Sequence, residues 1–157
     1  MHTHRLRKVR LKGIHTHCAR IIMTCLPLFA TSCAMLVVHT LAVVCFCTMR
    51  ASSSLLLHRL CAVVYVVGPL TSMWNHGTAS AAARWTDRAA MTGGLSVDAW
   101  LWGWQLRRRE EAVAVGALTL AAVLCYACSK LSKMATLAHA LAHAWVTAAH
   151  VLLLWYL

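Results

Sequence analysis

Residues 21–47 read IIMTCLPLFATSCAMLVVHTLAVVCFC and contain no charged side chain. About 20 apolar residues in helical conformation cross the hydrocarbon core of a bilayer, so this stretch is long enough to span one. Three further apolar segments follow at 60–74, 112–128 and 136–157. The chain is therefore predicted to be an all-α, polytopic helical membrane bundle.

A fifth segment, residues 81–104, has the length of a span but contains charged residues, among them Asp87 and Asp98. A charge at the bilayer centre costs roughly 2.5–3.5 kcal/mol even on the mildest scale. This segment is expected either to face a polar interior or to lie at the interface, where its tryptophans would suit an aromatic belt. The expected number of transmembrane helices is therefore about five, that is, four to five.

The composition agrees with a membrane location. Apolar residues make up 61% of the chain, and 15 Lys and Arg stand against 4 Asp and Glu. Residues 1–20 are predicted to form a basic N-terminal tail, followed by a single transmembrane helical domain at 21–157. Because the basic residues flank apolar spans and form no separate basic domain, they suit anionic lipid head groups, and nucleic acid is not an expected partner.

Ionisable groups at membrane depth suggest a functional site. Ser72 and His76 lie four residues apart, on one face of a helix, and Asp87 follows His76 by eleven residues. His139 and His143 repeat the four-residue spacing, and His150 continues their stripe. A chain reversal at 77–80 would place the His76 and Asp87 segments side by side.

This set of residue types suits metal-assisted hydrolysis. Three histidines with an open fourth position form a common catalytic zinc arrangement, and such a zinc lowers the pKa of its water towards neutrality. Asp87 could orient that water or take its proton. Ser72 could donate a hydrogen bond to the developing oxyanion of a carbonyl substrate.

The same five residues resemble the signature of a membrane hydrolase superfamily that includes the alkaline ceramidases, the adiponectin and progestin receptors and the myomaker-like proteins. Residues 76–80 (HGTAS) are similar to the ceramidase run His-Ala-Thr-x-Ser, and residues 139–143 (HALAH) to His-Ala-Leu-Trp-His. The resemblance implies zinc bound by His76, His139 and His143. Ser72 and Asp87 would assist hydrolysis of a ceramide-like lipid amide, in the endoplasmic reticulum or Golgi.

The chain departs from that family in two ways. The family has seven helices, whereas the 52 residues from Asp87 to His139 are too few for the three helices that normally intervene. Loss of two helices keeps the Asp87 segment and the last helix in one orientation, so the site is expected to assemble in an active hydrolase or a degenerate relative. The ceramidases also carry an acidic N-terminal calcium site, and because no acid precedes Asp87, calcium is not expected.

Two other functions are compatible with the pattern. The chain could be a non-catalytic subunit or assembly factor of a membrane protein complex, for example in the mitochondrial inner membrane. Histidines on different helices, such as His39 with His143, could instead ligate haem. Convergence of His76, His139 and His143 would favour zinc, and rings pointing to different sides of the bundle would exclude it.

Overall fold

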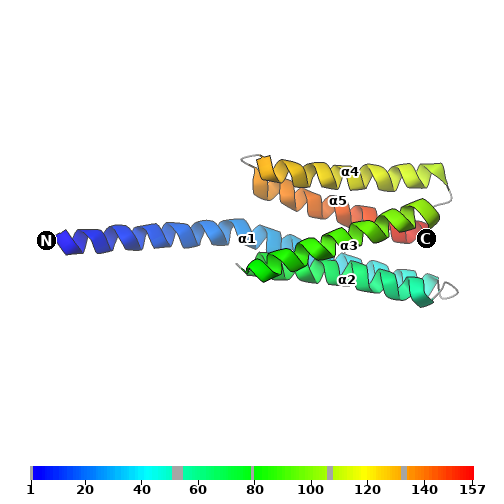
Figure 1. Cartoon of the computed structure of the whole chain (residues 1–157), viewed down its shortest axis with the longest axis horizontal. Helices are drawn as coiled ribbons and strands as arrows, with labels where there is room; N and C mark the ends of the chain where they lie inside the picture. The colour runs from blue at the N-terminus through cyan, green and yellow to red at the C-terminus, as the bar shows by residue number, and fades with distance from the viewer. Residues whose placement is uncertain (1, 51–54, 79, 106–107, 132–133) are drawn as a thin grey trace.

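The computed structural model describes the backbone of residues 2–50, 55–78, 80–105, 108–131 and 134–157, and side chains from residue 26 onward within these ranges, except those of 55, 104 and 105. The described residues form five helices and no strand (Figure 1). This confirms the predicted all-α bundle of about five helices. The helices are α1 (His2–Met49), α2 (Leu55–Gly77), α3 (Ala81–Gln105), α4 (Arg109–Leu131) and α5 (Ala135–Tyr156).

Four of these helices are long and apolar enough to cross a membrane: Leu26–Met49 of α1, Leu56–Gly77, Arg109–Leu131 and Ala135–Tyr156. Large apolar side chains cover their outer faces; Leu41 of α1 and Leu120 of α4, for example, are 60% and 58% exposed. A soluble protein rarely exposes contiguous apolar surface on this scale. The chain is an integral membrane protein whose outer surface faces lipid.

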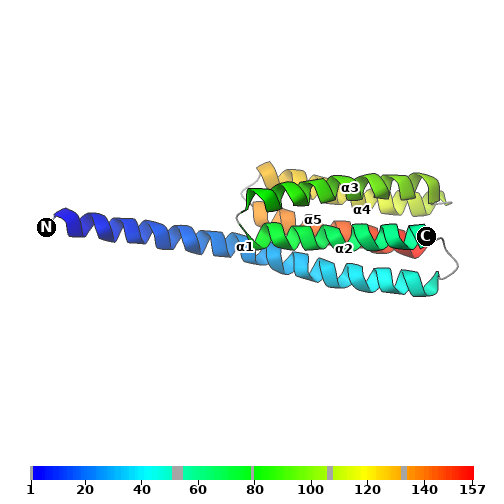
Figure 2. The same cartoon turned by 60° about the horizontal axis from the view of Figure 1, so that its bottom comes forward.

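Helix α3 is the charged segment, and it is not among these four candidate spans. It packs along α2, and Figure 2 shows it running the length of the bundle. Asp87 is buried, and the Asp98 side chain is only 13% exposed, whereas Met91 and Leu95 point outward. Of the two expected positions for this segment, the structure shows the first, in which the acidic residues face a polar interior.

Helix α4 begins at Arg109, three residues before the apolar segment predicted at 112–128, and Glu110 and Glu111 form its first turn. Carboxylates are favoured there because they interact well with the unpaired N–H groups and the positive end of the helix dipole. The Trp102 indole N–H also donates to the Ala112 carbonyl oxygen at 2.8 Å, which joins the end of α3 to α4. Arg107 lies outside the described residues.

The predicted basic tail at 1–20 belongs to α1 from residue 2 onward, and this end of the helix projects beyond the bundle (Figures 1 and 2). The side chains of residues 2–25, including four histidines, lie outside the described part of the structure.

The helices pack in a simple order: α1 against α2 and α5, α2 against α3, and α4 against α5. Short connections make successive helices antiparallel, so α3 and α5 run in the same direction. The apolar core fills the end of the bundle where α1, α3 and α5 finish; it consists of Val43, Phe46, Cys61, Tyr65, Leu101, Val115, Leu153 and Leu154. Buried polar residues occupy the middle and the opposite end.

Candidate metal centre

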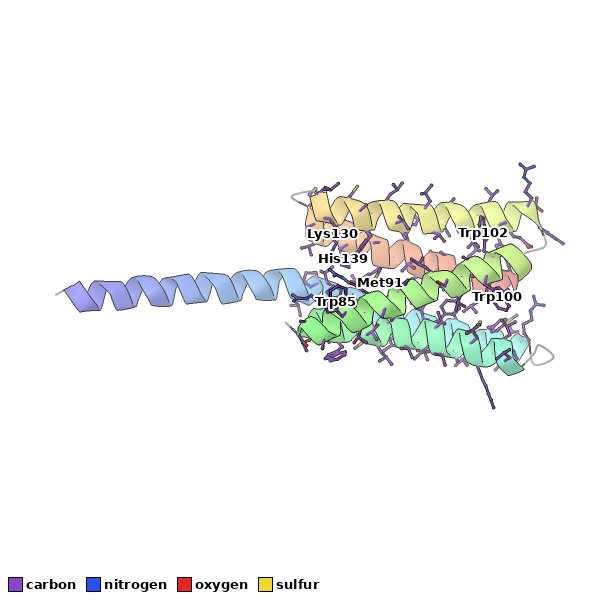
Figure 3. All side chains as sticks on the ribbon, in the orientation of Figure 1. Trp85, Met91, Trp100, Trp102, Lys130 and His139 are labelled. Carbon is purple, nitrogen blue, oxygen red and sulfur yellow. The ribbon has the colours of Figure 1, made fainter. Side chains whose placement is uncertain are left out.

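The three histidines predicted to bind zinc lie together. His76 is in the last turn of α2 and His139 and His143 are in the first turns of α5, and both helix ends lie at the same end of the bundle. One nitrogen from each ring lies within 4.8 Å of the other two. The ring centroids are separated by 5.0 Å (His76–His139), 5.4 Å (His76–His143) and 5.0 Å (His139–His143). Figure 3 shows His139 at this end of the molecule, near Lys130.

The donor set suits a zinc ion. Three imidazoles supply three of four tetrahedral positions at Zn–N distances of about 2.0–2.1 Å, so small side-chain rotations would draw the nitrogens to ligand distance. His76 Nε2 is buried and has no hydrogen-bond partner among the described residues. A buried polar atom without a partner costs about 1–3 kcal/mol. Metal coordination is one way to remove that penalty.

Thr31 of α1 lies against the ring of His143. The Thr31 hydroxyl lies 2.9 Å from the Leu28 carbonyl oxygen and 3.0 Å from His143 Nδ1. When the single hydroxyl proton is donated to Leu28, the threonine oxygen accepts from His143 Nδ1–H. The lone pair of His143 then lies on Nε2, where it is free to bind a metal, as in many sites whose ligands are oriented by an outer hydrogen bond.

We expect Thr31→Val to weaken zinc binding by about 10- to 100-fold, the usual effect of removing an outer partner of a ligating histidine. The matched control is Thr147→Val. Thr147 lies one turn beyond His143, and its hydroxyl donates to the His143 backbone carbonyl at 2.8 Å and not to the ring. Competition with a zinc-chelating dye would measure both affinities. Equal affinities in the two variants would contradict the assigned role of Thr31.

Asp87 lies buried in the second turn of α3. Asn75, the residue before His76, donates its side-chain N–H to Asp87 Oδ2 at 2.7 Å. This bond ties the Asp87 carboxyl to the end of α2. Asp87 is not in the group of three converging histidines, and its role as an assisting carboxylate stays a prediction.

Ser72 is also buried, one turn before His76. Its hydroxyl lies 3.1 Å from the hydroxyl oxygen of Ser32, which itself donates to the Leu28 carbonyl at 2.8 Å. When Ser32 donates to Leu28, Ser72 donates to Ser32, and the pair of hydroxyls links α2 to α1. Its predicted role as an oxyanion donor would require rotation of this hydroxyl and stays a prediction.

Three neighbours of the site were missed in the sequence: Thr31, Ser32 and Asn75. The adjacent hydroxyls at 31 and 32, inside an otherwise apolar span, were the available signal. His39 contacts His150 and His143 contacts Thr31; haem ligation by His39 with His143 stays a prediction.

An apolar groove of about 880 Å³ begins beside the histidine cluster. His143 and Thr31 lie at one end, and Trp155 lies twelve residues further along α5. Twelve helical residues rise about 18 Å. The remaining lining comes from α1, α4 and α5 and is almost wholly apolar: Ala34, Met35, Val38, Leu118, Ala140, Ala144, Thr147, Ala148, Val151 and Leu152.

No protein-family model matches the chain, and no curated protein or solved structure matches it significantly. The function of the protein is therefore inferred from its residues and from how the fold arranges them.

Proposed function

We propose that this chain is a zinc-dependent membrane hydrolase that acts on a lipid amide. The observation that carries the proposal is the convergence of His76, His139 and His143 from two helices. Chance alone easily produces one His-x-x-x-His pair among ten histidines, but it does not explain a third imidazole meeting that pair from another helix.

The chemistry follows from the residues at this end of the bundle. His76, His139 and His143 would hold the zinc ion, which when bound would supply activation of a water for attack on a carbonyl. Thr31 holds the His143 ring with its Nε2 lone pair exposed. Asp87, fixed by Asn75, serves as the group that takes a proton during the attack and returns it to the leaving amine.

The groove favours a lipid as substrate. An acyl chain lying along α5 from His143 towards Trp155 would be surrounded by apolar side chains, and its carbonyl end would lie at the histidine cluster. A ceramide-like amide, which joins one acyl chain to a hydroxylated base, fits this geometry. The ceramidase-like signature supports the endoplasmic reticulum or Golgi membrane as the proposed location of the protein.

Metal analysis of purified protein tests the proposal. We expect one zinc per chain in the wild type and a large loss in His139→Ala, because two histidines without a third hold zinc weakly. His58→Ala is the control, since His58 packs edge-on against Phe46 at the other end of α2. Equal zinc in the wild type and His139→Ala would overturn the metal site.

Hydrolysis is measured in parallel as fatty-acid release from a ceramide-like amide in mixed micelles. Zinc-dependent release supports the enzyme. Zinc without release on any lipid amide supports the degenerate relative, in which the metal has a structural role. A chain without zinc that copurifies stoichiometrically with larger membrane proteins would be a subunit of a complex, and the hydrolase proposal would fail.

A further inference from the structure

A second polar cluster lies two helical turns from the metal centre, towards the middle of the bundle. It consists of His39, Tyr65, Asp98 and His150, one residue from each helix except α4. His39, Tyr65 and His150 lie seven residues along their helices from Ser32, Ser72 and His143 respectively. Seven residues rise about 10 Å, so this cluster is a separate layer of the bundle.

The contacts form a chain. The Tyr65 hydroxyl donates to Asp98 Oδ1 at 2.7 Å, and Asp98 Oδ2 lies 2.7 Å from His150 Nε2. The opposite nitrogen of the same ring, His150 Nδ1, lies 3.2 Å from His39 Nε2. The tyrosine ring also packs against the His150 ring, with 4.5 Å between centroids.

This arrangement does not suit a metal. A metal ligand set needs one atom from each residue to converge on a point. His150 instead uses nitrogens on opposite sides of its ring for its two partners, and among the described residues only the His76 group meets the convergence criterion. A carboxylate followed by two imidazoles in line is a path for a proton.

The burial of these hydrogen-bonded side chains favours a functional role. His39 is 1% exposed and Tyr65 is fully buried, while the side chains of Asp98 and His150 are each 13% exposed. Ionisable residues at membrane depth are rare and mark proton relays in many membrane proteins. The further titratable neighbour is the buried Cys61, which interacts electrostatically with Tyr65 and Asp98.

Counting protons shows a free position at one end. With Asp98 ionised and both rings neutral, His150 donates through Nε2 to Asp98, and His39 donates through Nε2 to His150. His39 Nδ1 is then a bare acceptor, and it is buried without a hydrogen-bond partner among the residues that the structure describes. The ring faces the backbone of Tyr65. The carbonyl of that residue lacks its usual helical donor, because residue 69 is proline.

We propose that His39, His150 and Asp98 form a proton-binding relay within the membrane. A proton taken up at His39 Nδ1 turns this nitrogen into a donor towards the Tyr65 carbonyl. The Nε2 proton of His39 passes to His150 Nδ1, and the positive charge comes to rest on His150, beside the Asp98 carboxylate. Only N–H bonds form or break, and the cluster of His39, His150 and Asp98 gains one proton. The relay is independent of the zinc chemistry proposed for the first cluster.

The alternative is a static interhelical link, since polar side chains commonly hydrogen-bond between helices in membranes. The relay and the static link differ in whether the histidine rings change their protonation. Imidazole nitrogen NMR on the full chain in nanodiscs, with ¹⁵N-labelled histidine and from about pH 4 to about pH 9 around the ordinary histidine pKa, separates them. We expect His150 to change from singly to doubly protonated as the pH falls. A single tautomer of His39 and of His150 throughout would overturn the relay.

Variants tie the signal to the cluster. Asp98→Asn should remove the doubly protonated form of His150, because the neutral amide no longer balances its charge, and Asp98→Glu should restore it. If Asp98→Asn does not fold, the wild type is compared with Asp98→Glu instead. The relay then requires His150 to become doubly protonated over the same pH range in both proteins. An unchanged titration in folded Asp98→Asn would contradict the proposal. His139→Ala, which removes a zinc ligand, should leave the His150 titration intact and so separates failure of the hydrolase from failure of the relay.

Discussion

Replacing Asp87 with alanine is expected to lower the rate of lipid-amide hydrolysis by about 10²- to 10⁴-fold, the usual contribution of a positioned general base. Zinc content should stay at the wild-type level, because Asp87 is not among the three converging ligands. The measurement is kcat for release of fatty acid from a ceramide-like amide, paired with metal analysis of the same preparation.

Two variants serve as comparisons for Asp87→Ala. Asn75→Ala removes the 2.7 Å hydrogen bond to the carboxyl but leaves the carboxyl in place, so its effect should be smaller. Ser96→Ala, on an exposed face of α3 where the hydroxyl bonds only the Thr92 carbonyl, should leave kcat unchanged. Loss of zinc together with activity in Asp87→Ala would show that the carboxyl supports the metal site and would contradict a role as base.

Tyr65→Ala is expected to have the largest effect on stability, about 3–5 kcal/mol, as is typical when a buried aromatic side chain is truncated. Tyr65 is fully buried within the apolar core and also donates to Asp98 at 2.7 Å. Truncation therefore opens a cavity and leaves a buried carboxylate oxygen unpaired. Unfolding of the purified protein in detergent, followed by circular dichroism, would measure the change.

Tyr65→Phe separates the two contributions. It keeps the ring and removes only the hydroxyl, so it should cost about 1–3 kcal/mol, the penalty for leaving a buried acceptor unsatisfied. Val63→Ala is the control on the same helix, because Val63 is 59% exposed on the lipid-facing surface and its truncation opens no cavity. A loss in Tyr65→Ala no greater than that in Val63→Ala would show that this layer does not stabilise the bundle.

Much of the histidine cluster could be predicted from the sequence because helical geometry is regular. Residues four apart share a face, which places His139 and His143 together. Because short connections make successive helices antiparallel, the end of α2 lies at the same end of the bundle as the start of α5. His76 therefore lies at the same end as His139 and His143. The shared helix face depends only on residue spacing, and the shared bundle end depends only on helix number. Neither prediction requires the exact helix boundaries.

The residues that contact the histidine cluster could not be predicted from sequence spacing alone. Thr31 and Ser32 face two different helices from adjacent positions, and only the rotation of α1 against α2 and α5 decides which hydroxyl meets which partner. His39 was considered as a ligand for haem, yet it pairs with His150. From a sequence alone, a histidine on one helix could contact any of several histidines on other helices. The packing of the helices decides which contact forms.

By itself, the sequence determined that this protein lies in a membrane, because apolar runs of span length and scarce charge leave no other solvent for so much apolar surface. It also predicted four to five transmembrane helices and which histidines could share a metal. The tertiary structure decided where the charged segment goes: α3 turns Asp87 towards Asn75, and Asp98 towards Tyr65 and His150. The physical reason is that a buried carboxylate is tolerated only where donors from other helices meet it, and the positions of those donors are a property of the packed bundle.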